Sequence, residues 1–239
     1  MKSAGTILSF DTATNSCSVA LTTGGFSDGR LVGMQRFETG VSHSAKLLDS
    51  IDRLLKTVEM TLTDIAAVAI GTGPGSFTGL RIGMATAKGL THGASLPLIG
   101  VSSLDAVAAA VHSERPICVV MDARKKEVYC CFYRCSPGQI ATRCSEPMVI
   151  DPARLAEQID EPVTMAGDGL RVYRSLFLQK LENRVDMRPW LSSPSAENIG
   201  FLAAAHLAAE NFLDLDQAKP DYVRSSDAQL SLVSPLVRR

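Results

Sequence analysis

The hydrophobic pattern of the first hundred residues alternates between strands and helices. Short apolar runs separated by polar or glycine-rich turns predict three strands, over 7–10, 16–22 and 31–37. Over 43–58 the apolar residues fall on one side of a helical wheel and the charged residues on the other, which predicts an amphipathic helix. The continuous apolar run 65–70 is typical of a buried parallel strand, and a second helix is expected over about 76–91.

The second half of the chain repeats part of this pattern. Asp11 and Asp122 each end an apolar strand, 111 residues apart, and each is followed by a short polar turn and another apolar strand. A unit repeated at half-length suggests two lobes of related topology. We therefore expect an α/β protein with an N-terminal lobe over 1–101 and a C-terminal lobe over 102–239.

The remaining elements beyond residue 97 follow from the same periodicities. The predicted strands are 98–101, 117–121, 128–133 and 163–166. The predicted helices are 103–112, 154–159, 170–181 and 195–212.

Composition and charge narrow the function classes. The chain has 239 residues, with 24 Lys and Arg against 25 Asp and Glu, so a broad nucleic-acid-binding surface is not expected. A local basic patch, the Arg-Lys-Lys run at 124–126, remains. The six cysteines include no Cys-x-x-Cys pair and are too few for a disulfide scaffold. Glycine, proline and serine break the long uncharged stretches, so we expect no membrane span and a cytoplasmic protein.

The glycine-rich loop over 71–79 lies between a strand and a helix, where phosphate-binding loops occur. It lacks the Gly-Lys-Ser/Thr of a Walker loop, and its glycine spacing does not match the dinucleotide fingerprint. We expect a tight turn and a helix capped near Ser76.

The helix that follows this loop is apolar or small on nearly every side, interrupted only by Arg81 and Lys88. Gly79, Gly83 and Ala87 form a ridge of small residues that would let another helix approach closely. Such a helix must be buried on more than one face. Periodicity leaves open whether this chain's own fold or a partner protein covers it.

Candidate catalytic residues are few. His43 begins the first helix, but a metal site would need a second ligand one turn later, where the chain has Leu47, so a packing histidine is expected. Asp11 and Asp122 could orient water or Mg²⁺ beside a nucleotide, although aspartate at a strand end is also an ordinary turn residue. The candidate nucleotide cleft comprises Asp11, Thr12, Asp122, Gly167 and Gly169. No Gly-x-Ser-x-Gly nucleophile motif occurs.

Several motifs, in order along nearly the whole chain, resemble those of the bacterial TsaB (YeaZ) family. They are the segment 7–20, His43-Ser44, the Gly-Pro-Gly-Ser-Phe-Thr-Gly-Leu-Arg-Ile-Gly block at 73–83, 100–104, Asp122-Ala-Arg124 with Glu127-Val-Tyr129, and Pro220-x-Tyr-x-Arg224. The resemblance implies the duplicated two-lobe actin-like ATPase fold, which is ribonuclease H-like and has mixed sheets flanked by helices. This agrees with the repeat described above.

The resemblance also implies a function. The family provides a non-catalytic subunit for installing threonylcarbamoyl on the adenosine next to the anticodon of tRNAs that read codons starting with A. The paralogue TsaD carries out the transfer, the ATPase TsaE joins the assembly, and tRNA is reached through the complex. No cofactor is then required by this chain, and binding of ATP or ADP at the cleft or at the complex interface stays open.

The family pairs with TsaD, or with itself when alone, through the helices at 43–58 and 76–91. The residues expected at this interface are His43, Leu47, Leu48, Ile51, Leu54, Leu55, Phe77, Leu80, Arg81, Ile82, Gly83, Met84 and Lys88. In this interpretation Arg81 and Lys88 orient the contact and the small-residue ridge sets its closeness, so that Gly83→Leu would abolish pairing in a monomer that still folds.

Two other classes remain open. One is an independent ATPase or kinase-like enzyme that uses Asp11, Asp122 and the turn at 167–169. The other is a metallopeptidase, which the sequence does not support: TsaD holds metal through a His-x-x-x-His pair, and this chain has only the first histidine, His43. We therefore expect no metal.

Overall fold

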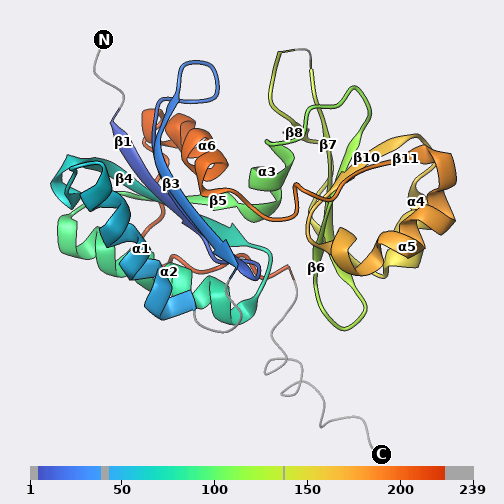
Figure 1. The fold of residues 1–239 in the computed structure, drawn as a ribbon, viewed down its shortest axis with the longest axis horizontal. Coiled ribbons are helices and arrows are strands. Elements are labelled where there is room, and N and C mark those ends of the chain that lie inside the picture. The colour runs from blue at the N-terminus through green and yellow to red at the C-terminus, as the bar shows by residue number, and fades with distance from the viewer. Residues whose placement is uncertain (1–4, 39–42, 137, 224–239) are drawn as a thin grey trace, which may run out of the picture.

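The computed structural model describes residues 5–38, 43–136 and 138–223, which form two lobes, each built on one mixed sheet (Figure 1). In the first sheet the strand order is β3 (Arg30–Glu38), β2 (Ser16–Thr23), β1 (Thr6–Asp11), β4 (Ile65–Gly73) and β5 (Leu98–Ser102). β1 and β2 are antiparallel, as are β2 and β3, whereas β4 runs parallel to β1 and to β5.

The second sheet repeats this arrangement. Its strand order is β11 (Val185–Arg188), β10 (Val163–Ala166), β6 (Ile117–Asp122), β7 (Val128–Arg134) and β8 (Thr142–Arg143), with β9 (Met148–Ile150) also paired to β7. β6 is antiparallel to β7 and parallel to β10, just as β1 is to β2 and β4. The predicted duplication is confirmed. The pattern missed β8, β9 and β11, which are short and have no fully buried residue.

Helices cover both faces of the first sheet because its strands alternate apolar side chains between the faces. Leu8 and Phe10 of β1 join a core cluster with α1 (His43–Thr57) and α2 (Phe77–Ala94). Ile7, on the opposite face, joins a cluster with α6 (Ala196–Ala208). A 3-10 turn (Leu62–Asp64) leads from α1 into β4.

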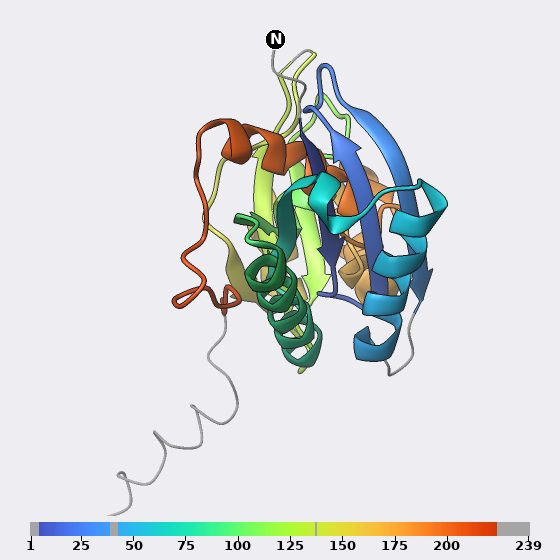
Figure 2. The same ribbon diagram turned by 90° about the vertical axis from the view of Figure 1, so that its left-hand side faces the viewer.

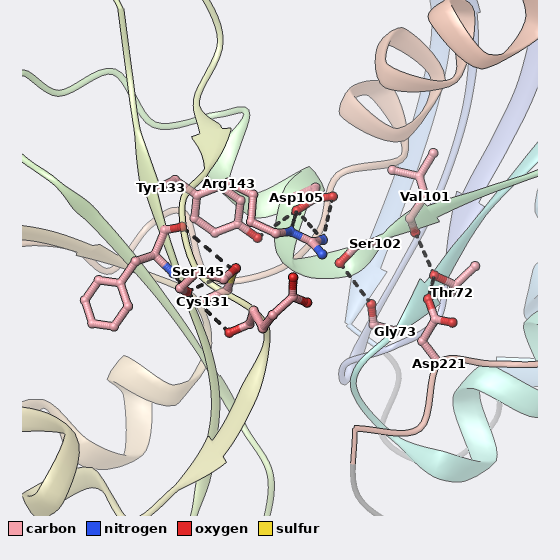
Figure 3. A network of polar contacts seen from close by, with 12 residues as sticks. Thr72, Gly73, Val101, Ser102, Asp105, Cys131, Tyr133, Arg143, Ser145 and Asp221 are labelled. Atoms are coloured by element: carbon pink, nitrogen blue, oxygen red, sulfur yellow. Dashed lines mark hydrogen bonds and ion pairs between the residues drawn. The ribbon is translucent and has the colours of Figure 1, made fainter. Parts of the chain in front are cut away.

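The second sheet is covered in the same way. α3 (Ser103–Ala108) packs on one face, and α4 (Pro152–Gln158) and α5 (Gly169–Leu181) pack on the other. A short 3-10 turn (Glu182–Arg184) precedes β11. Arg143 of β8 contacts both carboxylate oxygens of Asp105, at 2.7 and 2.8 Å, and Tyr133 of β7 donates to the same carboxylate at 2.8 Å (Figure 3). These contacts tie α3 to the second sheet.

The predicted lobe boundary is wrong for the C-terminal helix. α6 lies within 102–239, yet Ile199 and Ala203 pack against Ile7 and Ile99 of the first sheet. The chain thus returns to the first lobe after completing the second sheet, and residues 213–221 hydrogen-bond to β5 and β4. Periodicity showed that α6 has an apolar side, but it does not specify which sheet that side covers.

The ridge of small residues on α2 faces this chain's own sheet. A Cβ on Gly79 would lie 2.0 Å from the carbonyl oxygen of Thr12, and one on Gly83 would lie 2.5 Å from Thr12 Oγ1 and 3.3 Å from Ile70 Cδ1. The interpretation of this ridge as a partner contact is therefore wrong. Gly83→Leu would disturb the fold itself, so it cannot probe pairing alone.

Gly79→Ala tests this close approach. The new methyl group would meet backbone that cannot move aside cheaply, so we expect the free energy of unfolding to fall by at least about 2 kcal/mol. Gly89→Ala is the matched control, because a Cβ at this exposed position of the same helix meets nothing within 4 Å. The control should gain about 1 kcal/mol from helix propensity. Urea denaturation measures both, and equal effects would contradict the packing described here.

Candidate functional site

Fewer residues of α1 and α2 face outward than the predicted interface contains. Both helices lie on the same outer face of the first sheet (Figure 2). Seven of the expected contact residues are buried in this chain's own core, which corrects their assignment to a partner surface: Leu47, Ile51, Leu54, Leu55, Leu80, Gly83 and Met84. Five of them belong to the core cluster on the first sheet, Gly83 lies against Thr12 and Ile70, and Leu80 joins the cluster of α3 and the second sheet. The side chain of His43 lies outside the described residues.

The remaining interface residues are accessible. Leu48 is 52% exposed and Phe77 is 37% exposed, and both are large apolar side chains. Arg81 is exposed, and Ile82 and Lys88 are partly so. Together these five form what we call the outer surface of α1 and α2. Protein interfaces are enriched in aromatic residues and arginine, as Phe77 and Arg81 are here, whereas lysine is depleted.

Arg81 has a defined conformation on this surface. Its guanidinium lies over the Phe77 ring, 3.7 Å from the ring centroid, and its Nε donates to the Tyr222 hydroxyl oxygen at 3.3 Å. The Tyr222 and Phe77 rings are 5.2 Å apart between centroids. Sequence reasoning did not place Tyr222 here. The only signal was the Pro220-x-Tyr-x-Arg224 motif, whose Arg224 lies outside the described residues.

The glycine-rich loop before α2 docks on the turn after β1. Ser76 caps the helix, since its Oγ accepts from the Gly79 N–H at 3.3 Å, which confirms the predicted cap. The Ser76 N–H donates to the Ala13 carbonyl at 2.6 Å, and Thr12 Oγ1 donates to the Gly79 carbonyl at 2.8 Å. The glycines of the loop thus let its backbone pack closely against the backbone of the turn after β1.

A cavity of about 360 Å³ lies between the lobes. The start of α2 and the turn after β1 form one wall, and the β6–β7 hairpin and Asp168 form the other. Its charged and aromatic lining residues are Phe77, Asp122, Arg124, Lys125, Tyr129, Asp168, Asp221 and Tyr222. Its size is at the lower end of small-molecule pockets.

Only one of the five predicted cleft residues lines this cavity, and that residue is Asp122. Asp11 is fully buried, and its carboxylate accepts from the Ala13 N–H at 2.8 Å and from Ser103 Oγ at 2.7 Å. Thr12 is buried as well. A Cβ on Gly167 would lie 2.0 Å from the Val120 carbonyl oxygen, so this glycine is needed for packing against β6, and the buried Gly169 lies against the same strand. These four residues therefore do not line the cavity.

Asp168 is the acidic residue that sequence reasoning missed, although it stands between the two glycines that were named. Its Oδ1 accepts from the Asp122 N–H at 3.0 Å. Burial raises its pKa to about 6, and the nearby Asp122 carboxylate acts in the same direction, while Arg124 and Arg171 oppose them. Arg124 contacts the Asp122 carboxylate at 3.2 Å. The wall therefore combines two carboxylates with basic side chains, which suits a small polar ligand.

Among residues 5–38, 43–136 and 138–223, no cluster of three or more histidine, cysteine, aspartate or glutamate side chains could hold a metal ion. Within the same residues, no helix has the length and apolar character to cross a membrane.

The duplicated lobes place the chain in the actin-like ATPase fold class. Component A of (R)-2-hydroxyglutaryl-CoA dehydratase from Acidaminococcus fermentans shares this fold, with a TM-score of 0.50 at 12% identity over 85% of this chain and 99% of that one. YeaZ from Pseudomonas aeruginosa is much closer, with a TM-score of 0.74 at 28% identity over 91% of this chain and 99% of that one.

Sequence comparison agrees with this assignment. A family model described as "TsaD: tRNA N6-adenosine threonylcarbamoyltransferase" matches residues 38–232. The chain is 33% identical to the tRNA threonylcarbamoyladenosine biosynthesis protein TsaB of Escherichia coli K12, over 93% of this chain and 96% of that protein. The chain belongs to the family that this model describes, and within it to the TsaB (YeaZ) proteins, which confirms the resemblance seen in the sequence.

The buried Asp11 carboxyl makes stability depend on pH. Burial raises its pKa from the ordinary 3.8 to about 6. Between these values the folded state holds a proton that the unfolded state has lost, so the free energy of unfolding falls as pH rises from about 4 to about 6. A shift of about two units corresponds to roughly 3 kcal/mol. The raised pKa of Asp168 likewise makes the free energy of unfolding fall as pH rises through this range.

Asp11→Asn should remove the Asp11 share of this fall. The amide can keep both hydrogen bonds without a buried charge, so the variant should be more stable than the wild type above about pH 6.5, by roughly 2 kcal/mol. The difference should shrink toward pH 4. Urea denaturation across this range measures it, and parallel pH profiles would show that Asp11 does not titrate as described.

Proposed function

We propose that this chain is a non-catalytic, cytoplasmic subunit of the machinery that makes threonylcarbamoyladenosine in tRNA. It binds a TsaD-type paralogue, which performs the transfer to the adenosine next to the anticodon, and it pairs with itself when alone. TsaE joins the same assembly. The names of its relatives support the pathway. The observation that supports the role is the outer surface of α1 and α2, where the apolar Leu48 and Phe77 are accessible beside Arg81 on helices whose opposite sides pack in the core.

The buried position of Asp11 also favours a scaffold. In an enzyme that used both duplicated aspartates, the two carboxylates would need to face one ligand. Here Asp11 is enclosed, with its oxygens bonded to Ala13 and Ser103, while Asp122 lines the cavity. Asp11 therefore has a structural role in this proposal.

The chain needs no cofactor of its own in this proposal, and ATP or ADP acts through the other subunits or at their interface. A second candidate function, a nucleotide-binding ATPase, is favoured only by the cavity between the lobes, where Arg124 and Lys125 could face an anion. The same two residues, with Lys126, would form a basic contact for tRNA within the complex.

Leu48→Asp tests the pairing surface. A charge in place of this exposed apolar side chain should weaken binding to the TsaD-type paralogue, and pairing of the isolated chain, by about tenfold or more. Calorimetry measures the first and light scattering the second. The fold should not suffer, because the side chain is already more than half exposed.

Leu178→Asp is the matched control, since Leu178 of α5 is 43% exposed in the other lobe. It should bind as the wild type does. Loss of binding in both variants would point to a general charge effect, and loss in neither would place the partner on another surface.

Asp122→Asn separates the scaffold from the ATPase. In a reconstituted transfer assay with TsaD, TsaE, ATP and the activated donor, we expect the variant to support transfer within about twofold of the wild-type rate, because this carboxylate takes no part in the chemistry. The isolated wild-type chain should also fail to hydrolyse ATP. Turnover by the isolated chain that is lost in the variant would favour the ATPase instead.

A further inference from the structure

The segment after α6 runs back across the first lobe and ends beside the start of α2 (Figure 2). We call residues 213–222 the strap. At its beginning the Leu213 N–H donates to the Leu98 carbonyl of β5 at 2.8 Å, and near its end the Asp221 N–H donates to the Thr72 carbonyl of β4 at 2.8 Å. The strap is thus held to the first sheet at both ends.

Asp221 has a second anchor in its side chain. Its Oδ2 accepts from the hydroxyl of the buried Thr72 at 2.5 Å (Figure 3). A carboxylate that accepts from a buried hydroxyl makes a strong, directional contact. Together with the buried Pro220, this contact determines where the next residue, Tyr222, must lie.

Tyr222 then meets two residues of the outer surface of α1 and α2. Its hydroxyl accepts from Arg81, and its ring lies against Phe77. Arg81 in turn covers the Phe77 ring. A free arginine side chain has many rotamers, and ordering it during association costs binding free energy. A side chain ordered beforehand avoids that cost.

We propose that Tyr222 is a positioning residue, which holds Arg81 over the Phe77 ring in the conformation that the TsaD-type partner binds. The inference rests on the proposed function, and it extends the interface machinery from the two helices to the C-terminal strap. Tyr222 acts through Arg81, so the two residues contribute to binding as a unit.

The first test uses the free chain. Tyr222→Ala should speed amide hydrogen exchange at residues 80–83, in the first turns of α2, by about threefold or more. Phe212→Ala is the matched control, because Phe212 is 40% exposed and Tyr222 is 39% exposed, and both follow α6. The control should leave exchange at residues 80–83 unchanged, and the unfolding midpoint of both variants should stay close to that of the wild type.

The second test measures binding to the TsaD-type paralogue by calorimetry. Tyr222→Ala and Arg81→Ala should each raise Kd, by about fivefold and tenfold, and the double variant should bind no more weakly than Arg81→Ala alone. Tyr222→Phe keeps the ring and should recover part of the loss. This rescue and the lack of additivity distinguish positioning from a separate contact.

The outcomes separate the two proposals. If the Tyr222 variants bind as the wild type does, or if the two losses add, the positioning role is overturned while the proposed function stands. If the wild-type chain forms no complex, the proposed function fails, and the role of Tyr222 in binding fails with it. Faster amide exchange in Tyr222→Ala, non-additive losses of binding and rescue by phenylalanine would together support the positioning role of Tyr222.

Discussion

The contact between the start of α2 and the turn after β1 determines much of the rest of the structure. Two backbones meet there with no room for a Cβ at Gly75 or Gly79, and Thr12 and Ser76 hydrogen-bond across the contact. Asp11 shapes the same turn through the Ala13 N–H. Because α2 is held by its glycine side, its opposite side must face outward. The accessible Phe77 and Arg81 are a consequence of this packing.

The duplicated aspartates show how one local unit serves two purposes. Both end the first strand of a lobe, and both accept a hydrogen bond from the backbone two residues later. In the first lobe Ser103 closes over Asp11, and burial raises the pKa of this carboxyl. In the second lobe Asp122 lines the cavity beside Arg124 and Asp168. The strand–Asp pattern predicted the unit in each lobe. Whether the carboxylate meets solvent depends on residues distant in the sequence, so the pattern could not predict it.

The path of the chain joins the lobes more closely than their order in the sequence suggests. α6 fills the free face of the first sheet, and the strap that follows it reaches α2. The outer surface of α1 and α2 is therefore in contact with Tyr222, a residue from near the other end of the chain. A mutation near residue 222 can alter the helix at residue 77, although 145 positions separate them.

The alternation of strands and helices, the repeat at half-length and, through the block at 73–83, the family could all be predicted from the sequence. These depend on local periodicity and on a run of adjacent residues, which a single chain displays directly. The folded chain was needed to show which side of α2 is covered, that Leu47 is buried while Leu48 is exposed, and that Asp11 does not line the cavity. The physical reason is that periodicity specifies the polarity of a face. The neighbour that covers that face is brought there by the topology of the whole chain.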